Sequence, residues 1–169
     1  MSKIADAFNS PDWIGLVSNL LTVWLLLGAS IWLLLRTGSN FGAPTTTSPR
    51  DAPWTPPGAV IGAVWALLYT LMALSLWVLN RTPAAGGASL KLGVLLLIVF
   101  CLVWPFYAFS QTSRLPGLLG NIGILVIAVF VIWRLWPYSI TAAGMIAPVS
   151  VWITIATASI LDGARRYGW

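Results

Sequence analysis

The amino-acid sequence predicts an all-α membrane protein, a five-transmembrane-helix bundle, from its composition and from the positions of its charges. Its 169 residues are 59% hydrophobic and 8% charged, whereas a soluble domain carries about 25% charged residues. The charged residues are clustered, and five stretches contain none of them: Trp13–Leu35, Ala52–Asn80, Leu92–Ser113, Leu115–Trp133 and Leu135–Leu161. Each stretch is close to the roughly 20 apolar residues that cross a bilayer. We therefore expect a multi-pass integral membrane protein.

The first predicted helix follows Asn9-Ser10-Pro11-Asp12, in which Ser10 is expected as the N-cap and Pro11 and Asp12 suit the first turn. This helix is longer than the apolar region of a signal peptide, and it follows a start of mixed charge, so we expect it to be retained. The long polar segment 36–56 is rich in Gly, Thr, Ser and Pro, which predicts a loop. Such a loop can cover one end of a bundle.

The other helices follow at short intervals. Pro57 suits the first turn of the second helix, Pro105 predicts a kink near the end of the third, and Pro148 lies inside the fifth. Short connections make consecutive helices antiparallel neighbours, so we expect one domain over residues 1–169. The predicted spans are 13–35, 57–79, 90–109, 115–133 and 138–162.

Composition also argues against several classes of function. The net charge of +5 comes from basic residues beside the predicted spans, where they contact lipid headgroups. A nucleic-acid partner would need a solvated basic face, which the short connections do not provide. The sequence has no histidine, and its four carboxylates lie outside the spans, so we expect neither a metal site nor an enzyme. Cys101, the single cysteine, is expected to be a small core residue.

Eight of the eleven tryptophans fall into two groups. Tryptophan anchors helix ends at the headgroup level, which explains one group: Trp13, Trp54, Trp133, Trp136 and Trp169. Trp24, Trp65 and Trp152 lie near the middle of their helices, and two explanations stay open for them. They pack between helices, or they line an internal pocket for a flat hydrophobic ligand. Tyr69 follows Trp65 by four residues, so the two share one helix face.

Several motifs coincide with a known family. Trp54-Thr55-Pro56-Pro57 is followed, after six residues, by Val64-Trp65, and then by Tyr69 and Met72. In this spacing the sequence resembles the TspO/MBR family, the translocator proteins that are also called tryptophan-rich sensory proteins or peripheral benzodiazepine receptors. Two weaker motifs are similar to the family's third and fifth helices: Trp104-Pro105-Phe106-Tyr107, and Pro148 with Trp152 and Ala156. The resemblance covers the whole chain.

The resemblance implies a flat hydrophobic ligand, a tetrapyrrole or a sterol-like molecule, bound without a covalent link in a tryptophan-lined cavity under the first loop. It implies a sensor, transport or regulatory role, with lipid and a hydrophobic small molecule as partners. Arg36 or Arg50 would pair with the propionates of a porphyrin. The ligand-binding residues that it implies are Trp54, Trp65, Tyr69, Trp104, Pro148 and Trp152.

The sequence departs from the family's pattern at four positions that are usually polar. Leu97 and Cys101 stand in place of Gln and Asn, Val149 in place of Tyr, and Ile160 in place of Asn, with Asp162 two residues on. Such a pocket would favour more apolar ligands or bind the same ligands less tightly. An alternative therefore stays open: an accessory subunit of a larger membrane complex, such as a pigment–protein complex of photosynthesis, that has lost ligand binding. A homodimer and, as a less favoured hypothesis, a tetrapyrrole-modifying enzyme also stay open.

Overall fold

The structure, a computed structural model, describes residues 3–36, 52–82, 87–108 and 114–168. These residues form helices and turns, with no strand among them. Five of the helices are long and apolar enough to cross a membrane, which confirms the predicted fold class. The helices are α1 (Lys3–Phe8), α2 (Trp13–Arg36), α3 (Gly58–Asn80), α4 (Gly87–Ala108), α5 (Leu115–Leu135) and α6 (Ile140–Tyr167).

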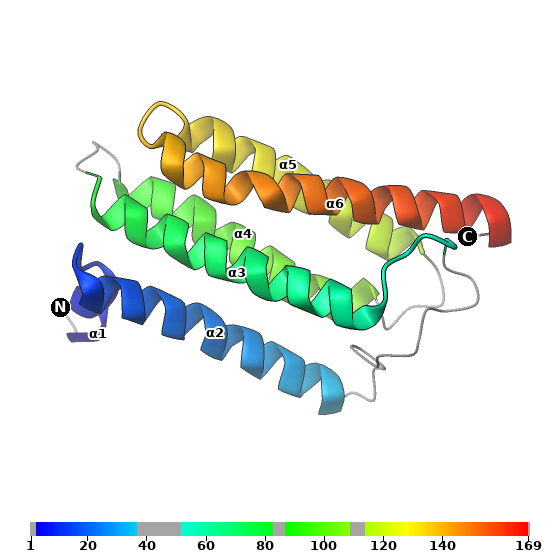
Figure 1. The fold of residues 1–169 in the computed structure, drawn as a ribbon, viewed down its shortest axis with the longest axis horizontal. Coiled ribbons are helices and arrows are strands. Elements are labelled where there is room, and N and C mark those ends of the chain that lie inside the picture. The colour runs from blue at the N-terminus through cyan, green and yellow to red at the C-terminus, as the bar shows by residue number, and fades with distance from the viewer. Residues whose placement is uncertain (1–2, 37–51, 83–86, 109–113, 169) are drawn as a thin grey trace.

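Consecutive long helices run antiparallel (Figure 1), and the short connections between α3, α4, α5 and α6 require this arrangement. α3 occupies a central position, because it packs against α2, α4 and α6. α5 packs against α4 and α6, so α2 lies at one edge of the bundle and the α5–α6 pair at the other. α6 continues to Tyr167, beyond the expected end at 162. Its last turns are stabilised by an ion pair one helical turn apart, from Arg166 Nε to Asp162 Oδ1 at 3.0 Å.

The bundle interior follows a regular spacing along each helix, and α5 shows it most clearly. The buried residues of α5 alternate in steps of four and three: Gly117, Asn121, Ile124, Ala128, Val131 and Leu135. This spacing keeps one stripe of a helix against its neighbours. The stripe is apolar except at Asn121, which is therefore an unusual residue for its place.

Two serine hydroxyls join neighbouring helices in the interior. Ser75 Oγ of α3 donates to the Ala142 carbonyl of α6 at 3.1 Å, and Ser30 Oγ of α2 donates to the Leu102 carbonyl of α4 at 3.2 Å. Small polar residues of this kind let helix backbones approach and form hydrogen bonds where no water is present. Ser75 therefore positions α3 against α6, the helix pair that carries much of the candidate site, and Ser30 positions α2 against α4.

The N-terminal segment is tied to the end of the bundle by side chains of α3. Asn80 Nδ2 donates to the carbonyl oxygens of Phe8 at 2.8 Å and Ser10 at 3.1 Å. Trp77 Nε1 donates to the Asp12 carbonyl oxygen at 2.9 Å. α1 and the residues after it thus lie across one end of the helices, on the side of the α3–α4 and α5–α6 connections (Figure 1).

The start of α2 differs from the expectation for Ser10. The helix begins at Trp13, and Asp12 caps it, since its Oδ1 accepts from the backbone N–H groups of Ile14 at 2.9 Å and Gly15 at 3.3 Å. Ser10 donates its hydroxyl to the same oxygen at 2.6 Å. The Ser10 hydroxyl, followed by these backbone N–H groups, holds the pKa of Asp12 below its usual value. Ser10 therefore supports the cap instead of forming it.

We predict that Gly15→Ala destabilises the protein. A Cβ at Gly15 would lie 1.7 Å from the Ser10 carbonyl oxygen, so the segment that Asn80 and Trp77 hold must move. A steric conflict of this kind costs about 1–3 kcal/mol, which a lower melting temperature in detergent would report. Gly28→Ala is the matched control in the same helix, because no atom lies within 4 Å of a Cβ there. Equal melting temperatures for the two variants would contradict the prediction.

Candidate functional site

The centre of the candidate site is an aromatic pair on α3. The rings of Trp65 and Tyr69 are tilted by 33° with their centroids 5.6 Å apart. Tyr69 is only 3% exposed and belongs to the apolar core, while Trp65 is partly buried and packs against that core. Cys101 of α4 belongs to the same core cluster as Tyr69. The pair therefore faces into the bundle, as its spacing predicts.

Trp104 brings α4 and α5 together beside this pair. Its indole Nε1 donates to the Gly117 carbonyl oxygen of α5 at 3.2 Å, which fixes the plane of the ring. Trp104 follows Cys101 by three residues, so the two lie on the same face of α4. Tyr69 and Cys101 belong to one core cluster, and Trp65 and Trp104 pack against it, so the aromatic residues of α3 and α4 border one region of the interior.

α6 contributes Pro148 and Trp152, both partly buried. Trp152 packs against the same core cluster as Trp65 and Trp104. The structure thus brings the tryptophans of three helices to one cluster that contains Tyr69. Pro148 lies inside α6, one turn before Trp152. The segment 37–51, which was expected to cover this region, lies outside the described residues.

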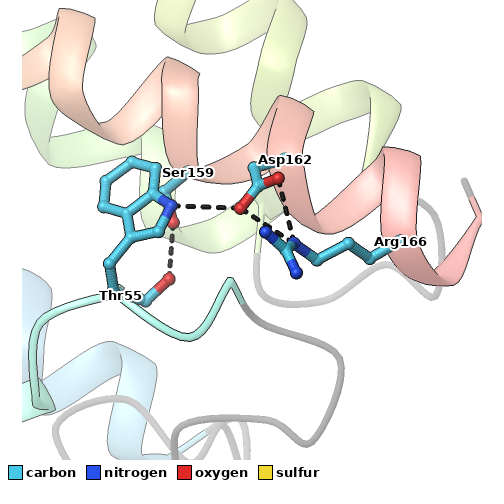
Figure 2. A network of polar contacts seen from close by, with 5 residues as sticks. Thr55, Ser159, Asp162 and Arg166 are labelled. Carbon is cyan, nitrogen blue, oxygen red and sulfur yellow. Dashed lines mark hydrogen bonds and ion pairs between the residues drawn. The ribbon is translucent and has the colours of Figure 1, made fainter.

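Trp54 is 47% exposed and is held by α6 through Asp162. Figure 2 shows Asp162 with Thr55, Ser159 and Arg166 around this contact. Its indole Nε1 donates to Asp162 Oδ2 at 3.0 Å, and Thr55 Oγ1 lies 2.6 Å from Ser159 Oγ, so the two hydroxyls share a hydrogen bond. Arg166 Nε donates to both oxygens of Asp162, at 3.0 and 3.1 Å. These contacts join the end of the first loop to the last turns of α6. The sequence predicts Trp54 at the headgroup level. The structure adds a hydrogen bond from its indole N–H to the carboxylate of Asp162.

The four departures from the family's pattern lie in different surroundings. Leu97, Cys101 and Val149 are at most 2% exposed and belong to the core cluster, so they fill the interior with apolar atoms. Ile160 is partly buried near the end of α6. Asp162, two residues after Ile160, is the residue that accepts the hydrogen bond of Trp54 at this end of α6. Sequence reasoning noted Asp162 but did not identify its partner.

Two residues are placed differently from what a pocket role requires. Trp24 is 45% exposed and is directed away from the core, so neither packing between helices nor pocket lining explains it. Arg36 ends α2 with its guanidinium 4.4 Å from the centroid of the Trp32 ring. Arg50, the other candidate for pairing with propionates, lies outside the described residues.

In the described part of the chain, no group of three or more His, Cys, Asp or Glu could hold a metal ion.

Asn121 is a feature that sequence reasoning missed. It is fully buried on α5, and neither atom of its side-chain amide has a hydrogen-bond partner among the described residues. It follows Gly117 by one helical turn, so it lies on the face of α5 that Trp104 contacts. An unpaired buried amide is costly. The signal in the sequence was a lone asparagine in an otherwise apolar stripe.

Comparison with known proteins agrees with this architecture. The model of the TspO/MBR family matches residues 22–161. The chain is 28% identical over 111 residues to the uncharacterized membrane protein YtaB of Bacillus subtilis, covering 65% of this chain and 72% of that protein. It is 26% identical over 104 residues to the tryptophan-rich protein TspO of Bacillus cereus (62% and 68% covered) and 31% identical over 117 residues to translocator protein 2 of Mus musculus (64% and 70%). With its five membrane-spanning helices, the chain belongs to the TspO/MBR family.

Proposed function

We propose that this protein binds a flat hydrophobic ligand, of tetrapyrrole or sterol-like type, between α3, α4, α5 and α6, and acts as a sensor, transporter or regulator. The observation that carries this proposal is the Trp65–Tyr69 pair, which faces the interior with Trp104 and Trp152 on the same core cluster. Aromatic faces favour flat ring systems, and binding cavities combine such surfaces with a few polar groups. Pro148 would border the ligand beside Trp152.

The polar group of this site would be Asn121. The family's polar positions on α4 and α6 hold Leu97, Cys101 and Val149, all in the core. Asn121 of α5 has an unpaired donor and an unpaired acceptor. A ligand with a ring N–H or a carbonyl group would satisfy the amide, and its apolar rim would suit the remaining walls. The ligand class is therefore a mostly apolar ring system with one polar edge.

The contact between Trp54 and Asp162 would close the mouth of the site. It joins the segment before α3 to α6, two of the helices that border the ligand. A ligand that enters from this end must displace the segment or wait for the contact to open. The name of translocator protein 2 suits the movement of a ligand, and we extend that role to this chain as part of the proposal.

We propose a non-enzymatic role. A general acid or base must reach the reacting atoms, and the sequence has no histidine. Three of its four aspartates lie near helix ends, Asp6, Asp12 and Asp162, and the fourth, Asp51, is outside the described residues. Illumination of the protein with protoporphyrin, followed by chromatography, should return the porphyrin unchanged. A new product that requires the folded protein would overturn this part of the proposal.

A second candidate is an accessory subunit without a ligand. It is favoured by the burial of Leu97, Cys101 and Val149, which leaves apolar packing at positions where the family is usually polar. Porphyrin titration separates the two candidates. Quenching of tryptophan fluorescence in a purified monomer or homodimer supports ligand binding. Absence of quenching, with co-purification in a larger membrane complex, supports the accessory role.

We predict that Trp65→Ala weakens the binding of protoporphyrin by about 3- to 10-fold. An aromatic contact contributes about 0.5–1.5 kcal/mol beyond the area that it buries. The measurement is a fluorescence titration in detergent micelles. Trp24→Ala is the control, because Trp24 is directed away from the core and should leave the affinity unchanged. The same loss in both variants would mean that the ligand does not lie beside Trp65.

We predict opposite effects of Asn121→Leu on stability and on binding. Leucine has a similar size and removes the unpaired amide, so the ligand-free protein should gain about 1–3 kcal/mol of stability. The same change removes the hydrogen bonds to the ligand, so affinity should fall. Thermal unfolding with and without protoporphyrin measures both effects. A more stable variant with unchanged affinity would show that Asn121 does not contact the ligand.

We predict that Trp54→Phe and Asp162→Asn both speed ligand release, and that the double variant is no faster than the quicker single one. Each change weakens the same hydrogen bond, so their effects should not add. A hydrogen bond to a charged group contributes about 1.5–3 kcal/mol when buried, and Trp54 is 47% exposed, so we expect less than a tenfold change. Stopped-flow displacement measures the rate. Trp136→Phe, an exposed tryptophan at the other end, is the control.

A further inference from the structure

An open groove runs along the outward face of α5, away from the candidate ligand site. Its volume is about 430 Å³, and five apolar side chains line it: Leu125, Val126, Val129, Phe130 and Trp133. At the end of the groove a smaller cavity of about 70 Å³ lies between α4 and α5. Its lining includes Ser89 and Gly93 of α4 and Phe130 and Arg134 of α5. Phe130 lines both, so the groove and the cavity lie next to each other.

A positive charge stands where the two hollows meet. The Arg134 guanidinium carbon lies 6.0 Å from the centroid of the Phe130 ring, and the Trp133 ring lies 5.9 Å from that of Phe130. Among the described residues, Arg134 forms no ion pair with a carboxylate. α4 begins at Gly87, which puts the positive end of its dipole beside the cavity. The cavity therefore carries positive charge that no carboxylate among the described residues balances, and it would attract an anionic group.

The dimensions of the groove match one leaflet of a bilayer. From Trp133 to Leu125 a helix rises about 12 Å at 1.5 Å per residue. The hydrocarbon depth of one leaflet is about 15 Å, half of the whole core. Arg134 lies at the last turn of α5, where the chain leaves the membrane. A molecule that fits both hollows thus has a charged end at the headgroup level and a chain that reaches into the leaflet.

We propose that these hollows bind one anionic phospholipid, with its phosphate at Arg134 and one acyl chain along the groove of α5. Basic pockets between transmembrane helices bind lipid headgroups through such charge complementarity. Phe130 would hold the guanidinium on one side while the phosphate meets it on the other. The site is distinct from the candidate ligand site, which lies on the buried faces of the helices.

Arg81 provides the matched control for this proposal. Arg81 follows the last residue of α3 and Arg134 lies in the last turn of α5, and these two helix ends are on the same side of the bundle (Figure 1). The Arg81 guanidinium stacks 4.8 Å from the centroid of the Trp77 ring. Arg81 lines neither of the two hollows. Replacing either arginine removes one positive charge from the same side of the membrane, so a general attraction to anionic lipid would respond equally to both. A specific lipid site at the two hollows would lose affinity only when Arg134 is replaced.

The experiment is lipid titration of the purified protein, followed by native mass spectrometry, with phosphatidylglycerol and phosphatidylcholine of identical chains. We expect one phosphatidylglycerol to bind the wild type in preference to phosphatidylcholine. Arg134→Gln should lower that preference about fivefold, the effect of one basic side chain beside anionic headgroups, and Arg81→Gln should preserve it. Equal binding of the two lipids by the wild type, or an equal loss in both variants, would overturn the proposal.

A second variant tests the cavity without changing charge. A Cβ at Gly93 already meets Val131 Cγ2 at 3.4 Å, so Gly93→Val would occupy the space between α4 and α5. Phosphatidylglycerol preference should fall in this variant although Arg134 is retained. The groove could instead receive a second copy of the chain. In that case Phe130→Ala would change the oligomeric mass and leave the lipid preference intact, a result that would also overturn the proposal.

Discussion

The absence of water from the bilayer interior is the constraint on which the rest of this structure depends. Every backbone polar group there must find a partner within the protein, and this requirement leaves helices as the elements of the bundle. It also limits the polar side chains of the interior to those that can reach an acceptor. Ser30 and Ser75 meet this condition, because each donates to a backbone carbonyl of a neighbouring helix. Asn121 does not meet it, which is why it stands out.

Because of the same constraint, most hydrogen bonds between side chains and distant segments lie at the two ends of the bundle. The contacts differ between the two ends. At one end, Asn80 and Trp77 of α3 donate to backbone carbonyls of the N-terminal segment. At the other, Trp54 donates to the carboxylate of Asp162. The first set consists of the partly buried Asn80 amide and Trp77 indole, which donate to backbone carbonyls, and this suits a permanent attachment. The second set is more exposed and depends on side chains that rotate, which suits a contact that opens.

α3 joins these features, because it packs against three other helices and also carries the Trp65–Tyr69 pair. The inward face of α3 thus stabilises the bundle and also carries residues of the candidate site. The outward face of α5 has a different relation to the membrane. There, exposed apolar side chains and Arg134 are available to lipid, as expected for a surface that water does not reach. Ligand and lipid would therefore approach α5 from opposite sides.

Much of the fold follows from local properties of the sequence. Hydropathy and the positions of charges determine that five helices cross the membrane, and spacing determines that Trp65 and Tyr69 share a face. These are properties of residues close in sequence, so no knowledge of other helices is needed. The start of α2 was harder to predict, because Ser10 and Asp12 are both good caps and their choice depends on the path that Asn80 imposes on the preceding residues.

The tertiary structure alone decided which residues meet across helices. Trp24 and Trp65 have equivalent mid-helix positions in the sequence, yet one is directed outward and the other packs on the core, because α2 lies at an edge and α3 at the centre. The partners Trp54 and Asp162 are 108 positions apart. Within the described part of the chain, Asn121 lacks a hydrogen-bond partner because of the residues that α4 and α6 place around it, which the sequence of α5 does not reveal. Composition and spacing thus determined the helices and their inward faces. The tertiary structure decided the contacts between helices, because the distance between residues of two helices depends on how whole helices pack.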